Sequence, residues 1–318
     1  MEDFIEALGQ GVYAIDTGFQ RPRFDAAYLL VEDGRAAFID TGTNHAVPRL
    51  LAALDALQLP RSAVDWVIPT HVHLDHAGGA GLLMQSLPEA RLLVHPRGLR
   101  HMLDPSALYQ GAMALYGEAE MQRSYGQLQA IPASRAQAST DSMTVMLADR
   151  PLLLIDTPGH ARHHHCIWDA RSRGWFSGDT FGLSYGEFKG ENGALIMPIS
   201  TPTQFDPAAL HASVRRMLSF APQAMYLTHY GQVDRPEELA ISLLEQVDQM
   251  VALGLQLRQS EDRLNRLKQG LQQLTLQRVQ AHGCTLPVER QLELLTFDIE
   301  LNAIGLGIWL DGLDAPKA

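Results

Sequence analysis

The chain has few cysteines and an excess of negative charge. Only two of its 318 residues are cysteines, Cys166 and Cys284, which excludes a framework of several disulfides and fits a reducing compartment. Lysine and arginine together number 25 against 36 aspartate and glutamate residues, giving a formal net charge of −11. A nucleic-acid-binding surface needs clustered positive charge, so we expect no nucleic-acid partner.

Long apolar runs and an export signal are also lacking. No apolar run reaches the roughly 18 residues that a membrane-spanning helix needs. The first six residues, Met1–Glu6, include three acidic side chains and lack the basic start and apolar stretch of a secretory signal. We therefore expect a cytoplasmic location without membrane association. With 46% hydrophobic residues, the chain can bury a large core in one domain or in a domain with an appendage.

Short apolar runs and turn residues alternate along the first 235 residues. Asp33-Gly34 between two β-rich runs is a strong hairpin signal. Strands are expected at residues 12–15, 28–32, 36–39, 64–68, 91–94, 143–155, 166–168, 175–177 and 224–227, and helices at 47–57, 78–87 and 206–220. The pattern predicts a mixed α/β domain over residues 1–235.

Two segments depart from this alternation. Residues 101–135 read as a helical insertion, with Asp104 and Pro105 as a helix start, which would form a lid or surface helices. After Pro236 the composition changes, and residues 236–318 are expected to form a helical C-terminal extension. Apolar residues recur every seven positions over 237–281, which predicts a long helix that Gly254 and Gly270 would weaken. This helix would pack on its own domain, cap a substrate pocket or join two subunits of a homodimer.

The central chemical signal is the motif Thr70-His71-Val72-His73-Leu74-Asp75-His76. It offers four potential metal ligands within six residues, between an expected strand and an expected helix. Imidazole and carboxylate groups suit zinc, iron or manganese. Without a cation, so many crowded polar groups would be costly to bury. The motif therefore predicts a metal site.

Three further candidates stand just beyond later strands. They are His160 in Thr-Pro-Gly-His, Asp179 in Ser-Gly-Asp-Thr and His229 in Thr-His-Tyr-Gly. Loops that follow strands are common carriers of catalytic groups. Together with the first motif they make seven candidate ligands, whereas one tetrahedral ion uses three or four. Seven ligands fit two ions that share a carboxylate, about 3.5–4 Å apart.

This set of motifs resembles the metallo-β-lactamase fold superfamily over about residues 10–235. The resemblance implies a four-layer αββα sandwich with the site at one edge of the paired sheets. It also implies the role of each candidate ligand: the first metal is held by His71, His73 and His160, the second by Asp75, His76 and His229, and Asp179 bridges the two.

The same resemblance gives supporting roles to Asp40 and His164, and three further residues are judged from their own positions in the sequence. Asp40, in an Asp-Thr-Gly turn, would orient a ligand, although an ordinary turn role is also open. His164 would lie behind the ligands without binding metal, whereas His163 would face the other way in an extended segment. Tyr185 and Tyr230 are candidate substrate contacts, with a loop or packing role as the alternative.

The charges of such a site predict hydrolysis. Two divalent ions would leave the site positive, attract a carbonyl or phosphoryl oxygen and convert a shared water to a bridging hydroxide. Asp75 would hold or receive the water proton as the catalytic carboxylate. The expected cofactors are two zinc ions, with iron or manganese also compatible.

Differences from known branches of the family narrow the range of expected substrates. Secreted β-lactamases of this fold lack the bridging carboxylate that Asp179 supplies, and quorum-signal lactonases carry tyrosine where this chain has Gly182. Flavodiiron oxygen reductases have glutamate at the position of His73. Hydroxyacylglutathione hydrolases and related thioesterases match all seven ligands, although the interval from His76 to His160 is longer here. We therefore expect a dinuclear hydrolase that cleaves a thioester or ester bond of a small molecule.

Other functions remain open at the level of sequence. An iron-dependent oxidoreductase, similar to persulfide dioxygenases or to oxygen-binding di-iron proteins, would use a comparable ligand set. A lactonase, a phosphodiesterase and a non-catalytic metal-binding sensor are the further alternatives.

Overall fold

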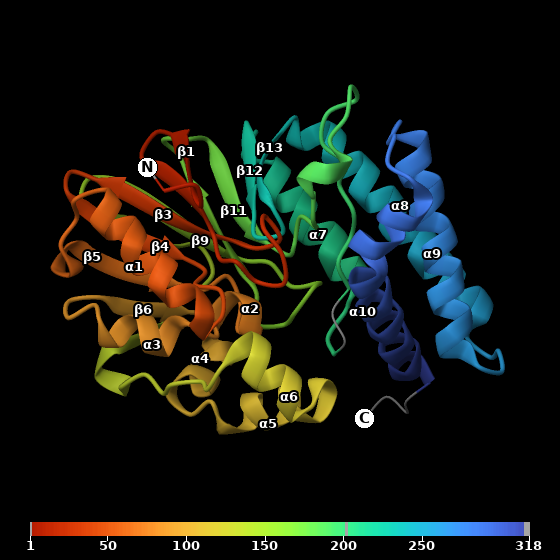
Figure 1. Ribbon diagram of the computed structural model, residues 1–318, viewed down its shortest axis with the longest axis horizontal. Helices are drawn as coiled ribbons and strands as arrows, with labels where there is room; N and C mark the ends of the chain where they lie inside the picture. The colour runs from red at the N-terminus through yellow and green to blue at the C-terminus, as the bar shows by residue number, and fades with distance from the viewer. Residues whose placement is uncertain (1, 201–202, 315–318) are drawn as a thin grey trace.

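Two β-sheets pack face to face, and the computed structural model describes residues 2–200 and 203–314 (Figure 1). Within these residues the first sheet has seven strands, the first four antiparallel and the last four, from β4 onward, parallel. In spatial order they are β1 (Ile5–Gly9), β2 (Val12–Asp16), β3 (Ala26–Glu32), β4 (Arg35–Ile39), β5 (Val64–Ile68), β6 (Arg91–Val94) and β7 (Ala136–Ala138).

The second sheet has six strands in the same described part of the chain. All neighbouring strands are antiparallel except β11 and β12, which are parallel. In spatial order they are β13 (Gly231–Asp234), β12 (Ala224–Leu227), β11 (Gly174–Gly178), β10 (His165–Asp169), β9 (Arg150–Asp156) and β8 (Met143–Leu147).

Alternating side chains build the layers. Along β3, Tyr28 and Leu30 face the other sheet, whereas Leu29 faces outward. Along β11, Phe176 faces inward and Trp175 outward. Because side chains alternate across a strand, a fully apolar strand supplies two cores at once. The inner core lies between the sheets, and a separate core lies on the outer face of each.

Helices cover both outer faces, which completes the four-layer αββα sandwich that the sequence predicted (Figure 1). The first sheet is covered by α1 (Val47–Ala56), α3 (Ala80–Gln85) and α4 (Pro96–Leu103). The second is covered by α7 (Pro207–Leu218) and the start of α8 (Pro236–Leu257). Asp206 caps α7 by accepting the Ala209 N–H at 3.0 Å, as expected at a helix start.

The expected insertion is helical. It contains the end of α4, α5 (Ser106–Tyr116), α6 (Glu118–Glu120) and a π-helical turn at Met121–Tyr125. Met121 and Tyr125 are buried, whereas Leu115 is exposed. One side of the insertion therefore packs on the sandwich near the candidate ligands, and the other faces solvent.

The prediction of a single long helix over residues 237–281 is wrong. α8 ends at Leu257 and α9 (Arg263–Ala281) begins after a short turn, followed by α10 (Val288–Asp314). Gly254 and Gly270 do not interrupt the helices: a Cβ on Gly254 would meet Leu306 at 3.0 Å, and one on Gly270 would meet Leu253 at 2.7 Å. The glycines instead allow the three helices to pack closely.

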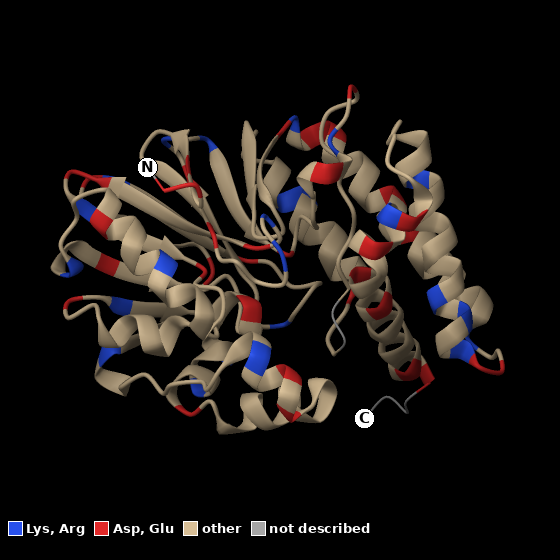
Figure 2. Ribbon diagram, in the orientation of Figure 1, with Lys and Arg blue, Asp and Glu red and all other residues tan. Residues whose placement is uncertain are grey.

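Apolar and charged contacts join the helices of the extension to one another, and apolar contacts of α8 join them to the domain. Leu243 and Met250 of α8 are buried, as are Leu267 and Leu271 of α9. Acidic and basic residues are interspersed over these helices (Figure 2), and three pairs tie them together: Arg258 with Asp314, Arg263 with Asp311 and Lys268 with Glu300. In the described residues, no helix is both long and apolar enough to cross a membrane.

Candidate metal centre

The seven candidate ligands meet at one end of the paired sheets. His71 and His73 follow β5, and the short helix α2 (Leu74–Ala77) carries Asp75 and His76. The other three ligands follow strands of the second sheet: His160 after β9, Asp179 after β11 and His229 after β12. The carboxyl ends of parallel β4 and β5 lie at the same edge, as do those of β11 and β12. The fold therefore brings together groups that are far apart in sequence.

The ligand atoms form two groups. One group comprises His71, His73, His160 and Asp179, and the other comprises Asp75, His76 and His229; within each group the ligand atoms lie within 4.8 Å of one another. His71, His76 and His160 are fully buried, whereas the Asp75 side chain keeps 24% of its surface exposed. The site is therefore open on the side of Asp75 and of half-buried His73.

Asp179 lies between the two groups. Its Oδ2 is 3.2 Å from His160 Nε2. Its Oδ1 is 3.2 Å from His76 Nε2 and 3.3 Å from His229 Nε2. The carboxylate thus turns one oxygen to each group, the arrangement that a bridging ligand requires.

Burial and neighbouring charges shift the pKa values of the candidate ligands in opposite directions. Burial lowers the pKa of His71 well below its usual range, and neighbouring His76 and His73 lower it further. Burial acts in the same direction on His76, but the carboxylates of Asp179, Asp40 and Asp75 outweigh it and hold that pKa well above its usual range. Burial would raise the pKa of Asp179, yet the surrounding histidines hold it well below its usual range.

The donor set fits cations. His76 Nε2 and Asp179 Oδ1 are both buried, lie 3.2 Å apart and form no hydrogen bond with each other or with another described residue. Buried polar atoms without hydrogen bonds are costly, and imidazole nitrogens and carboxylate oxygens are the ligands of zinc, iron and manganese. The residues present therefore fit two divalent ions that share Asp179.

Asp40 lies directly behind His76. Its Oδ2 is 2.8 Å from His76 Nδ1 and accepts the Thr228 hydroxyl, while Oδ1 accepts the Thr70 N–H at 2.7 Å. Asp40 adopts a φ of 55°, a left-handed conformation that aspartate tolerates better than most residues. That Asp40 orients a ligand stays a prediction.

His164 is fully buried beside the bridging residue. Its Nε2 accepts the Asp179 N–H at 3.2 Å, and its ring stacks on His71 with centroids 4.8 Å apart. His163 does not face away, contrary to expectation: its ring centroid is 5.4 Å from that of His73. The segment 157–164 bends out of extended geometry before β10, so strand alternation does not apply to it.

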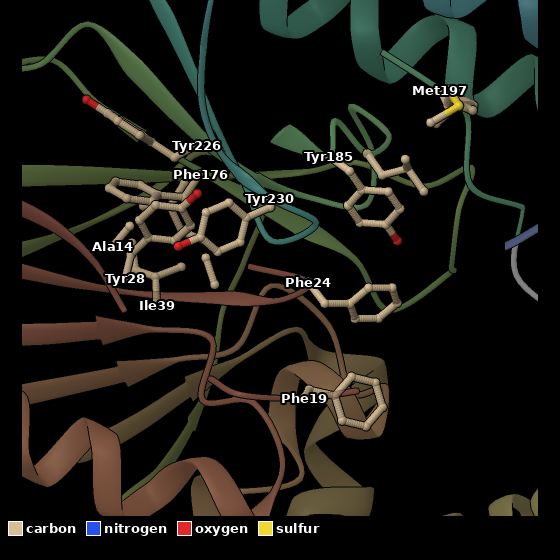
Figure 3. Close-up of a cluster of buried hydrophobic side chains, with 14 of the residues drawn as sticks. Ala14, Phe19, Phe24, Tyr28, Ile39, Phe176, Tyr185, Met197, Tyr226 and Tyr230 are labelled. Atoms are coloured by element: carbon tan, nitrogen blue, oxygen red, sulfur yellow. The ribbon is translucent and has the colours of Figure 1, made fainter. Parts of the chain in front are cut away.

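The two candidate substrate contacts are buried. Tyr185 is fully buried and its hydroxyl donates to Asp298 of α10 at 3.1 Å. Tyr230 is 9% exposed and lies beside Tyr28 and Phe176, whereas Tyr185 groups with Phe24 (Figure 3). Substrate contact by either tyrosine stays a prediction.

Asp25 is a neighbour of the site that the sequence analysis missed. It directly precedes β3, is fully buried, and its Oδ1 lies 2.6 Å from His229 Nδ1. Burial raises its pKa to about 6, although His229 acts to lower it. A charged residue directly before the apolar run Ala26–Val31 was the available signal.

Comparison with known proteins gives a family. The sequence model described as the metallo-beta-lactamase superfamily matches residues 21–222. The metallo-beta-lactamase fold-containing protein ST1585 of Sulfurisphaera tokodaii is 24% identical over 229 residues, which cover 70% of this chain and 80% of that protein. Acyl-coenzyme A thioesterase MBLAC2 of Gallus gallus is 27% identical over 188 residues, covering 54% of this chain and 64% of that protein.

Solved structures agree with the fold over nearly the whole chain. The crystal structure of ST1585 from Sulfolobus tokodaii superposes with a TM-score of 0.66 at 22% identity, covering 94% of this chain and 98% of that chain. TTHA1429 of Thermus thermophilus, a metallo-beta-lactamase family protein, superposes with a TM-score of 0.67 at 18% identity, covering 97% and 96%. The coverage extends into the C-terminal helices.

Proposed function

The chain belongs to the metallo-β-lactamase superfamily, and we propose that it is a dinuclear metallohydrolase that cleaves a thioester or ester bond of a small molecule. The observation that carries the proposal is the position of Asp179, whose two oxygens face separate groups of histidines. Such a carboxylate suits two cations rather than one. The name of MBLAC2, an acyl-coenzyme A thioesterase, favours thioesters among the bonds that such a site could cleave.

The chain's own residues have distinct parts in this proposal. One cation would be held by His71, His73, His160 and Asp179 Oδ2, and the other by Asp75, His76, His229 and Asp179 Oδ1. When bound, two cations lower the pKa of a shared water toward about 7 and polarise a carbonyl oxygen. Asp75, on the open side of the site, would take up the proton of the attacking water.

Aromatic side chains beside the ligands favour an apolar acyl group. The Phe24 ring meets the His229 ring edge-on at 5.8 Å and also contacts Phe19, Tyr185 and Phe297. Phe19 in turn contacts Tyr125 of the insertion at 5.4 Å. The insertion and α10 therefore both contribute to an apolar wall next to His229, in agreement with a capping role for each.

The metal and the assembly state belong to the same proposal. Five histidines and two aspartates without cysteine suit zinc, which we propose, and suit iron or manganese as well. We propose a cytoplasmic enzyme for a small-molecule substrate, with a homodimer formed through the C-terminal helices.

Asp179→Ala tests the proposal. We expect purified wild-type protein to hold two metal ions per chain and to turn over acyl-coenzyme A or ester substrates, and the variant to lose at least one ion and at least about 100-fold in kcat/KM. Elemental analysis and a panel of thioester, ester, lactone and phosphodiester substrates give the readouts. Asp141→Asn, at an exposed carboxylate paired with Arg216, is the matched control. Two ions and full turnover in Asp179→Ala, or an iron absorption spectrum without hydrolysis in wild type, would overturn the proposal.

A further inference from the structure

The two groups of ligands are backed by unequal charges. In the Asp75 group, His76 Nδ1 lies 2.8 Å from an Asp40 oxygen and His229 Nδ1 lies 2.6 Å from an Asp25 oxygen. In the other group, neutral oxygens stand behind the rings: His71 Nδ1 is 3.2 Å from the Thr70 hydroxyl, and His160 Nδ1 is 3.3 Å from the Ile199 carbonyl. In the described part of the chain, buried carboxylates therefore lie behind two imidazoles of the Asp75 group.

Backbone hydrogen bonds hold Asp25 beside His229. The Thr17 N–H donates to the Asp25 carbonyl at 3.0 Å, and the Ala26 N–H donates to the Thr228 carbonyl at 2.7 Å. These bonds tie the residues on either side of the pair together, so the start of β3 lies beside the end of β12. The Asp25 side chain has no surface exposed, and Phe24 packs on the His229 ring.

No other group explains a carboxylate at this place. Neither oxygen of Asp25 has a hydrogen-bond partner among the described residues other than the close contact with His229. A buried carboxylate without a partner is strongly destabilising. Contact with His229 is therefore the interaction that explains the buried Asp25 side chain.

We propose that Asp25 is the positioning residue for His229 and that binding of the second metal ion depends on it. This inference rests on the proposed function, because it assumes that Asp75, His76 and His229 hold an ion. A carboxylate 2.6 Å from Nδ1 favours the proton on that nitrogen, which leaves the lone pair on Nε2. This Nε2 lies 3.3 Å from Asp179 and 3.6 Å from Asp75. Fixing the ring and its tautomer strengthens metal binding by the imidazole.

The test measures metal binding rather than activity. Chelator-treated wild type, Asp25→Asn and Asp25→Ala are titrated with Zn²⁺ by isothermal titration calorimetry, and bound zinc is counted by elemental analysis after dialysis. We expect two binding events in wild type. In Asp25→Ala we expect the dissociation constant of the weaker event to rise about 10- to 100-fold, while that of the tighter event stays within about twofold of wild type. Asp25→Asn should show a smaller rise, because an amide oxygen can still accept the Nδ1 proton.

Asp156→Asn is the matched control, because Asp156 pairs with His95 at 3.1 Å and neither residue is a candidate ligand. Unchanged binding events in both Asp25 variants would overturn the inference and leave the proposed function standing. Equal weakening of both events in a variant that keeps the wild-type melting temperature would also overturn it, since the effect would not be specific to one ion. A wild-type protein that binds fewer than two ions would defeat the proposed function itself, and the inference with it.

Discussion

Residues directly behind the candidate ligands leave little free space at the metal centre. Gly178, the last residue of β11, precedes the bridging Asp179 and has a φ of +47°. A Cβ at this position would meet His164 Nε2 at 2.5 Å and the Thr70 hydroxyl at 2.6 Å. Both neighbours touch ligands or the groups that orient them, so this glycine allows the chain to pass close behind the metal centre.

Gly178→Ala should therefore lower both stability and metal affinity. We expect a loss of about 1–3 kcal/mol in the free energy of unfolding, because a left-handed conformation and two close contacts are both strained by a methyl group. Urea unfolding and zinc titration measure the two effects. Gly186→Ala is the control, since nothing lies within 4 Å of its added Cβ. Equal unfolding free energies and equal zinc affinities for Gly178→Ala and Gly186→Ala would contradict this account.

At the scale of an element, α10 connects the C-terminal extension to the metal centre. It places Asp298 within 3.1 Å of the Tyr185 hydroxyl and Phe297 against Phe24. Burial raises the pKa of Asp298 to about 6, although His229, Tyr185 and Arg21 act to lower it and Asp25 acts to raise it. The helix thus carries both an apolar and a titratable group to the side of the site.

Asp298 should make stability depend on pH. Its pKa is higher in the folded chain than the usual 3.8, so the folded state binds the proton more tightly and stability falls as pH rises from about 4 through about 6. We expect the free energy of unfolding of Asp298→Asn to exceed that of wild type by on the order of 1–3 kcal/mol at pH 8 and by almost nothing at pH 4. Denaturant unfolding at the two pH values measures the difference. Glu300→Gln, on the exposed side of α10, should show no such change, and a gain for Asp298→Asn that is equal at both pH values would refute the argument.

Loss of the Phe297 ring should weaken the binding of long acyl chains selectively. It is 36% exposed and touches the Phe24 ring at 6.3 Å between centroids, at the edge of the apolar wall. We expect Phe297→Ala to raise KM for a long-chain acyl thioester about 3- to 30-fold and to leave an acetyl thioester nearly unchanged, because only the longer chain would bury surface there. Ile241→Ala, at an exposed residue of α8, is the control. The same change for both substrates would exclude a role in acyl-chain binding.

At the scale of the whole molecule, the helical extension offers an apolar surface. Leu264 of α9 and Ile308 of α10 are 43% and 42% exposed and line one groove, together with Arg258, Arg263 and Asp311. Buried stripes of α8 and α9 pack within the protein, whereas Leu264 and Ile308 stay exposed and are available for contact with a second subunit.

The proposed homodimer can be tested through this groove. Multi-angle light scattering should give twice the 35.1 kDa mass of the chain for wild type. The double variant Leu264→Lys/Ile308→Lys should shift the protein to monomer, because lysines in an apolar contact are costly to bury. Ile241→Lys should leave the mass unchanged. A monomeric wild type at all concentrations would remove the dimer from the proposal.

Local patterns predicted a mixed α/β domain and most of the strand and helix positions, and the motifs' resemblance to the superfamily added the four-layer arrangement. Apolar runs identified strands such as β3 and β5, and His160, Asp179 and His229 each stand in a loop that follows an expected strand. The strands β1, β7 and β13 were missed because they are short and carry weak patterns. The turn at residues 258–262 was missed because the sevenfold apolar repeat continues through it.

The sequence by itself determined which side chains could bind metal and that they follow strands, because periodicity and turn chemistry depend on neighbouring residues. Only the tertiary structure decided which atoms face each other: the two oxygens of Asp179, the pairing of Asp25 with His229, the turn of His163 toward His73 and the bond from Tyr185 to Asp298. Three of these contacts join segments far apart in the chain, and the fourth depends on a bend in a loop. Sheet packing and helix docking set them, and no local spacing encodes that geometry.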